Sequence, residues 1–202
     1  MKFDKNEFIA LMKSGIEKFT LDPAVTQSLK GFDDGEFADP LFHWCTKKCG
    51  DELDLLALLH NWYNVTAPTG TLDDNIKYVQ MCYDSVIKSD ATFNKLFRTK
   101  WSRDVIDGGR ALFANAVPGV CMNDSAFGEL DSLIYVHGFN AIWLPIIDKI
   151  RPPRIYLCGA WAKPLPKILR EGLRYPAQVE AKCHPVAYGK VSWANCDNLS
   201  EE

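Results

Sequence analysis

Three short apolar runs and one short run of alternating polar and apolar residues, spread along the chain, limit the folds that this sequence can adopt. Runs of about four to eight apolar residues between turn residues are typical of strands buried on both faces of a sheet. The predicted strands are Leu53–Leu59, Arg110–Val117 ending at Pro118-Gly119, Arg154–Cys158 and Gln178–Cys183. Long segments separate the first three runs, and strands joined by helical crossovers pair in parallel.

Helical periodicity marks the segments around these strands. Within residues 4–20, the side chains Phe8, Met12, Ile16 and Phe19 recur at helical intervals, which predicts an N-terminal helix. Further helices are predicted to begin at Asp22-Pro23, at the capping box Thr71–Asp74, at Glu129 and after Gly159-Ala160. The helix from Glu129 to Ile150 is the longest, and a kink is expected at Pro145.

This alternation of strands and helices predicts an α/β fold. The expected architecture is a three-layer sandwich with a central, mostly parallel four-stranded sheet flanked by helices. A chain of 202 residues suits a single domain, 1–202, with N-terminal helices in about 1–50. Because such sheets bind ligands beyond the carboxyl ends of their strands, the residues at those ends are the candidates for a functional site.

The charge of the chain argues against a broad basic surface for nucleic acid. Acidic and basic residues are intermixed and the net charge is −3, so any phosphate site is expected to be local. No apolar run approaches the roughly twenty residues of a membrane helix, and the start MKFDKNEF is too charged for a secretory signal. We therefore expect a soluble, cytoplasmic protein with no membrane partner.

The cysteines argue for a reducing compartment and against a metal centre. There are seven, scattered and odd in number, so most are expected to be reduced core residues. The one metal-like pattern, HWCTKKC, brings His43, Cys45 and Cys49 together, but no second pair of ligands completes it. An iron–sulfur cluster would need four thiolates. We therefore expect neither a metal ion nor a cofactor.

Polar or small residues lie at the end of each predicted strand. The residues His60-Asn61-Trp62-Tyr63 follow the first strand, and Asn115 lies close to the end of the second. Gly159-Ala160 follow the third strand and His184-Pro185 follow the fourth. Since parallel strands end at one edge of a sheet, these residues are predicted to converge on one site.

The segments around these residues resemble the motifs of a known superfamily. LFANAVPGV (112–120) resembles the strand motif LLLNAVLTV, LCGAWA (157–162) is similar to LLWGSYA, AKCHPVAYG (181–189) corresponds to AHPSPLS, and LLHNWYN (58–64) stands where the family carries GQDPYH. That family is the uracil-DNA glycosylase superfamily, and the resemblance covers roughly residues 50–195 in the same order. It implies a glycosylase-like fold and a DNA partner that contains uracil or another deaminated base.

The resemblance assigns the base-reading role to Asn115, whose amide can both donate and accept hydrogen bonds with uracil. It implies that His184 donates to the uracil oxygen that gains charge as the glycosidic bond breaks. His60 and Tyr63 are implied to bind the base, with the Tyr63 ring blocking the methyl group of thymine. The residues alone leave an alternative open, in which Asn115 satisfies backbone groups and His184 holds the Pro185 turn.

Two positions depart from the family pattern. Asn61 replaces the usual aspartate, and Val186-Ala187 replace the Ser-Pro that normally follows the His-Pro pair. An amide cannot act as a base, although it can orient water, so Asn61 is assigned that catalytic role. Some mismatch-directed members of the superfamily use asparagine here, and a site that has lost catalysis is the alternative.

DNA contacts are expected from small residues and one lysine. Backbone N–H groups at the helix start after Gly159 and in the loops Ala67–Gly70 and Tyr188–Lys190 are candidates for phosphate contacts. The DNA-binding residues predicted are Gly159, Pro185, Tyr188 and Lys190, of which Lys190 is the main phosphate ligand and Tyr188 either wedges into the duplex or is an ordinary surface tyrosine. The aromatic residue that stacks on the base stays open among Trp44, Trp62 and Trp161.

Two functions follow from these observations. The first is a DNA repair glycosylase that hydrolyses the N-glycosidic bond of uracil or a related deaminated base, acting as a monomer. The alternative is a glycosylase-like fold without activity that serves as a nucleic-acid- or protein-binding module. The missing carboxylate and the net negative charge favour the alternative, whereas Asn115 and His184 together favour the enzyme.

Overall fold

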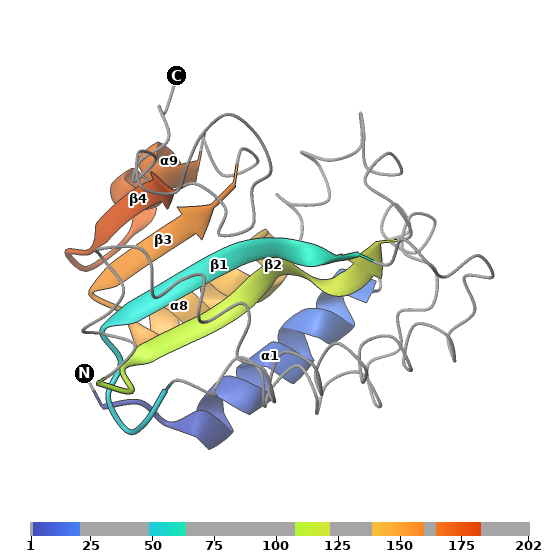
Figure 1. Cartoon of the computed structure of the whole chain (residues 1–202), viewed down its shortest axis with the longest axis horizontal. Coiled ribbons are helices and arrows are strands. Elements are labelled where there is room, and N and C mark those ends of the chain that lie inside the picture. Colours follow the sequence, from blue (N-terminus) through green and yellow to red (C-terminus); the bar gives the residue numbers. More distant parts are fainter. Residues whose placement is uncertain (1, 21–48, 64–107, 122–138, 160–164, 183–202) are drawn as a thin grey trace.

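A computed structural model describes residues 2–20, 49–63, 108–121, 139–159 and 165–182, and it contains a four-stranded sheet with helices packed against it (Figure 1). The strands are β1 Leu55–Tyr63, β2 Ala111–Cys121, β3 Arg154–Cys158 and β4 Gln178–Lys182. The helices are α1 Lys5–Thr20, the π-helix η2 Phe139–Trp143, α8 Leu144–Ile150 and α9 Leu165–Gly172. Their arrangement confirms the α/β class.

All neighbouring strands of this sheet run parallel, in the order β2-β1-β3-β4. Leu55 starts the register, since it pairs with Ala111 of β2 and with Arg154 of β3. Successive residues of β1 and β2 point to opposite faces, yet Leu55–Leu58 and Ala111–Ala114 are all fully buried. Burial on both faces explains why these strands appear in the sequence as continuous apolar runs.

The predicted ends of β1 and β2 were wrong. β1 was expected to end at Leu59 and β2 at Val117, but they continue to Tyr63 and Cys121. The predicted turn at Pro118-Gly119 is an irregularity within β2, because Asn61 pairs with Val117 and Trp62 with Val120. Proline lacks an N–H for the ladder, and a bulge is one of the places where a strand tolerates it.

The N-terminal helix agrees closely with the sequence. The Asp4 side chain caps α1, since its Oδ1 accepts hydrogen bonds from the N–H groups of Asn6 at 2.9 Å and Glu7 at 3.1 Å. The apolar stripe predicted for this helix, Phe8, Met12, Ile16 and Phe19, is buried in the core. The stripe packs α1 against η2 and α8.

The segment before β3 was predicted as one long α-helix with a kink at Pro145. Its described part is instead a π-helix, η2, followed directly by the short α-helix α8. Pro145 lies in the first turn of α8, where its missing N–H costs no intrahelical hydrogen bond. The irregularity in this described part is the wider π-turn that precedes the proline. Residues 129–138 of the predicted helix lie outside the described part.

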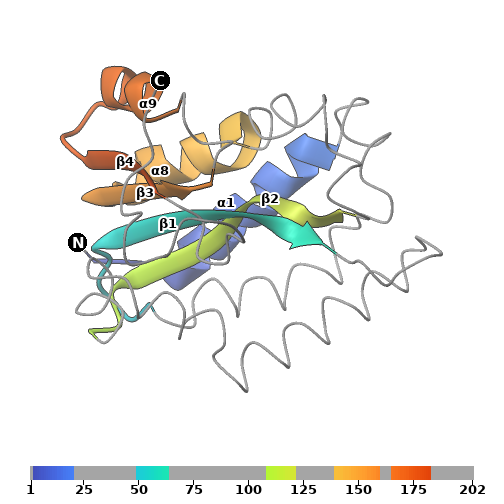
Figure 2. The same ribbon diagram turned by 45° about the horizontal axis from the view of Figure 1, so that its top comes forward.

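The described helices lie on the same side of the sheet. Figures 1 and 2 show α1 and α8 behind β1 and β2, with α9 beside β4. α9 buries Leu165 and Leu169, and its Arg170 Nη1 donates a 2.6 Å hydrogen bond to the Val179 carbonyl of β4. Right-handed crossovers explain the placement of α8 and α9, because the connections β2-to-β3 and β3-to-β4 both run in the same direction across the sheet.

The amino ends of the strands are tied together by polar contacts. Arg110 Nε lies 3.0 Å from Asp54 Oδ2, an ion pair outside hydrogen-bond geometry, and Arg154 Nε lies 3.4 Å from the Asp54 carbonyl oxygen. The chain start joins the same edge through a 2.7 Å hydrogen bond from the Phe3 N–H to the Asp51 carbonyl. The chain itself therefore links the amino ends of these strands.

Candidate functional site

The carboxyl ends of the four strands form one edge of the sheet, as the sequence predicted. Within it, the ends of β1 and β3 are neighbours whose following connections run in opposite directions, toward β2 and toward β4. Such a point opens a crevice between strand ends in parallel α/β sheets and is where they bind their ligands. The sheet order therefore marks the boundary between β1 and β3 as the place for a site.

The residues expected after the first strand lie inside it. His60, Asn61 and Tyr63 occupy the last positions of β1. The physical reason is that β2 also continues beyond its predicted end, so that each of the residues 61–63 has a pairing partner. Asn61 pairs with Val117, and Leu59 pairs with Asn115. His60 lies between Leu59 and Asn61, at the alternate position along the strand.

Asn115 lies in the interior of β2 rather than close to its end, because this strand extends to Cys121. It pairs with Leu59, two positions before Asn61 in the neighbouring strand. Asn115 and Asn61 thus hold positions of the same parity in adjacent strands, which is the juxtaposition that a shared site would require.

Gly159 follows β3 directly and has a backbone conformation that few other residues adopt. Its φ is 126°, and its N–H donates a 2.8 Å hydrogen bond to the Lys182 carbonyl at the end of β4. A phosphate contact at this turn would therefore have to use later amide groups. Those groups, residues 160–164, lie outside the described part of the chain.

The other predicted site residues also lie outside the described residues. They are His184, Pro185, Tyr188 and Lys190, together with the loop Ala67–Gly70, the tryptophans Trp44 and Trp161, and His43 and Cys45 of HWCTKKC. The remaining candidate ligand of that motif, Cys49, is described and buried. Cys158 is a second buried free cysteine, as expected of reduced core residues.

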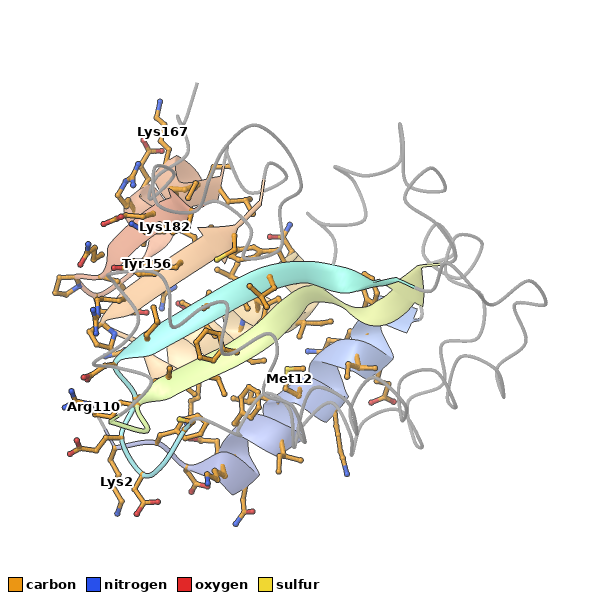
Figure 3. All side chains as sticks on the ribbon, viewed as in Figure 1. Lys2, Met12, Arg110, Tyr156, Lys167 and Lys182 are labelled. Atoms are coloured by element: carbon orange, nitrogen blue, oxygen red, sulfur yellow. The ribbon has the colours of Figure 1, made fainter. Side chains whose placement is uncertain are left out.

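A charged group that the sequence analysis missed lies just before the predicted His184 segment. Lys182, Glu180 and Tyr156, which we call the Lys182 cluster, lie on the same face of β3 and β4 because Tyr156 pairs with Glu180 and Cys158 with Lys182 (Figure 3). Lys182 forms an ion pair with Glu180, and its Nζ lies 4.7 Å from the centre of the Tyr156 ring. The alternation of polar and apolar residues in Gln178–Lys182 is the sequence signal that could have identified this face.

The Lys182 cluster shifts the acidity of its members. Burial alone would raise the pKa of Glu180, but hydrogen bonds from Lys182 and Gln178 and the charges of Lys182 and Arg170 bring it below its ordinary value. Burial, followed by the Glu180 charge, raises the pKa of Tyr156. Burial also raises the pKa of the Cys158 thiol to about 12, although the Lys182 charge opposes this. At neutral pH the cluster therefore holds a carboxylate and a neutral phenol, and the neighbouring Cys158 thiol is neutral.

In the part of the chain that the structure describes, no group of three or more His, Cys, Asp or Glu side chains is arranged to hold a metal ion. No described helix is both long enough and apolar enough to cross a membrane.

No protein-family model, no curated protein and no solved structure matches this chain.

Proposed function

We propose that this protein is a DNA glycosylase of the uracil-DNA glycosylase type, which hydrolyses the N-glycosidic bond of uracil or a related deaminated base. The observation that carries the proposal is that all four motif segments overlap strands of one parallel sheet. LLHNWYN covers the end of β1, LFANAVPGV lies within β2, LCGAWA begins in β3 and AKCHPVAYG begins in β4. Motifs in this order on parallel strands lead toward a common edge.

The chemistry of such an enzyme suits the residues at that edge. The damaged nucleotide must leave the base stack, at a cost of a few kcal/mol, and must then be read in a pocket. In the proposed mechanism the Asn115 amide pairs with the uracil carbonyl and ring N–H. Asn61, at the neighbouring register position of same parity, orients the attacking water, and His184 donates a hydrogen bond to the departing uracil anion.

The proposal includes the three-layer architecture. The described helices cover one face of the sheet. The connection from β1 to β2 runs in the opposite direction across the sheet from the other two, so a right-handed crossover would carry it over the other face. The complete burial of Leu55–Leu58 and Ala111–Ala114, which point to both faces of the sheet, supports this arrangement.

The proposal is tested by measuring free base released from labelled oligonucleotides with uracil in a single strand, opposite adenine and opposite guanine. The parent, Asn61→Asp, Asn115→Ala and His184→Ala are compared. We expect release by the parent, faster release by Asn61→Asp because a carboxylate can act as a base, and losses of about a hundredfold or more in the alanine variants. Absence of release from every protein would refute the enzyme.

A second candidate function is a binding module with the same fold. It is favoured by the uncharged Asn61 and by the net charge of −3. Activity in Asn61→Asp but not in the parent would select it, since the pocket would be intact and only the base missing. A salt titration adds a second distinction, because phosphate contacts make DNA affinity fall as salt rises, whereas a protein-binding module would bind DNA weakly at any salt.

A further inference from the structure

The ammonium group of Lys182 is buried at the carboxyl end of β4. Its side chain is only 7% exposed. Among the described residues, Lys182 is the only polar or charged residue that is buried. An ammonium group loses its hydration when it is buried, which is unfavourable unless charges and hydrogen bonds replace the water. The neighbours of Lys182 must therefore replace the lost hydration of its ammonium group.

Two neighbours on the same face of the sheet hold the ammonium group. The Glu180 carboxylate forms an ion pair with Lys182 through Oε2 and accepts a hydrogen bond from the Gln178 amide through Oε1. The Tyr156 ring from β3 lies 4.7 Å from Nζ, within the range of a cation–π contact. Figure 3 shows Lys182 and Tyr156 on adjacent strands. The side chain is thus fixed to its own strand and to the next.

A buried ion pair such as that of Lys182 and Glu180 contributes little to the free energy of folding. Replacing a buried ion pair by apolar side chains of similar volume is often neutral or stabilising, so the charge contributes more to a specific geometry than to the free energy of folding. Here that geometry includes the main chain. The carbonyl oxygen of Lys182 accepts the 2.8 Å hydrogen bond from the N–H of Gly159, the residue that leaves β3.

We infer that Lys182 is a positioning residue, which fixes the carboxyl ends of β3 and β4 relative to each other. The Glu180 carboxylate and the Tyr156 ring immobilise its side chain, and this holds the Lys182 carbonyl in place for the Gly159 amide. The chain leaves the sheet from these two residues toward the segments that the proposed function uses. The consequence for catalysis rests on that proposed function. The role of Lys182 in fixing the ends of β3 and β4 does not depend on it.

The first test is hydrogen exchange of the Gly159 amide, followed by NMR on the full chain. Lys182→Met keeps most of the length of the side chain and removes its charge. We expect Gly159 to exchange about tenfold faster or more, while the Leu157 amide in β3 is unchanged, because only the strand end opens. Equal acceleration of both amides, or no change at Gly159, would refute the inference, since a purely stabilising role affects the strand as a whole.

Two further variants keep the test informative. Glu180→Gln breaks the same ion pair from the other side and should also accelerate Gly159 exchange, and it replaces Lys182→Met if that variant does not fold. In the double variant the effects should not add, because both act through one contact; additive effects would contradict the inference. Lys149→Met is the control, since Lys149 pairs with Glu7 on the surface, 3.1 Å away, and should leave Gly159 unchanged.

The effect on base release is measured in the same variants. We expect Lys182→Met to lower kcat about tenfold or more with little change in KM, because the residue orients the strand ends and does not touch the DNA. If the parent releases no base, the proposed function fails and the Gly159 exchange alone decides the inference. If the parent is active and Lys182→Met retains its kcat, the positioning role is refuted while the proposed function stands.

Discussion

The indole N–H of Trp143 donates a 3.0 Å hydrogen bond to the main-chain oxygen of Ala116, the residue after Asn115. Both groups are buried, so the bond joins the π-helix η2 to β2 within the core. Trp143 is the largest of the fully buried side chains in the described residues. The packing under the Asn115 position therefore depends on this contact.

Trp143→Phe should lower the free energy of unfolding by about 1–3 kcal/mol, because the Ala116 carbonyl would be left buried without this donor. Urea denaturation followed by circular dichroism measures the change. Ile146→Val, a nearby fully buried position that makes no side-chain hydrogen bond, should cost about 0.5–1.5 kcal/mol and controls for lost volume. A Trp143→Phe variant as stable as the parent would contradict the prediction.

Gly15→Ala should destabilise the fold by about 1–3 kcal/mol through overpacking. A Cβ at Gly15 would lie 2.8 Å from the Ile142 Cα and 3.2 Å from the Ala141 carbonyl oxygen, both in the backbone of η2. α1 would have to move away from η2 to make room. The thermal unfolding midpoint measures the effect.

Gly172→Ala is the matched control for Gly15→Ala, because no atom lies within 4 Å of the added Cβ there. Gly172 is the last residue of α9, and alanine favours helix over glycine by up to about 1 kcal/mol. We therefore expect this variant to be as stable as the parent or slightly more so. Equal losses in both variants would show that the close approach of α1 to η2 is not the cause.

Acid should weaken the fold partly through Glu180. Its pKa is lower in the folded chain than its ordinary value of 4.5, so its contribution to stability is present above 4.5 and is lost as the pH falls through the folded value. In Glu180→Gln the free energy of unfolding should fall less steeply below about pH 4.5 than in the parent. Glu171→Gln removes an exposed carboxylate of α9 and is the control. Identical acid profiles for the parent and Glu180→Gln would contradict this prediction.

Alkaline conditions should weaken the fold through the buried thiols. Burial raises the pKa of both Cys49 and Cys158 from 9.0 to about 12, against smaller opposing effects of Lys5 and Lys182. Their stabilising contribution is present below pH 9.0 and is lost as the pH rises toward 12, at up to about 1.4 kcal/mol per pH unit for each thiol. Cys158→Ala should show a shallower decline in urea denaturation above about pH 9.

The same thiols should react slowly with iodoacetamide in the folded protein, because the thiolate is the nucleophile. Peptide mapping by mass spectrometry should find Cys49 and Cys158 unmodified at neutral pH and fully modified in denaturant. Rapid alkylation of Cys158 under native conditions would show that it is accessible.

The sequence predicted strand identity better than strand length. β3 has the predicted bounds, because Pro152-Pro153 and Gly159 limit it on both sides through local conformation. β1 and β2 are longer than predicted, since each continues only because the other offers a partner. Pro118-Gly119 is a local turn signal that this tertiary pairing overrides.

The candidate site was predictable to a different degree at each strand. The common edge followed from parallel pairing alone, whereas Asn115 lies in the interior of β2, because this strand continues to Cys121. The Lys182 cluster could not be assembled from the sequence, because it joins Tyr156 to Glu180 across two strands and depends on their register. A one-residue shift of that register would have separated them.

The bond from Arg170 to the Val179 carbonyl bears on how this protein behaves at high concentration. β4 is the outer strand of the described sheet, and a main-chain acceptor on such a strand is a template on which another chain can add a strand of its own. The Arg170 guanidinium already occupies that acceptor from α9. Arg170 thus blocks a main-chain acceptor that another chain would need in order to add a strand to β4. Arg170→Ala would expose the Val179 carbonyl.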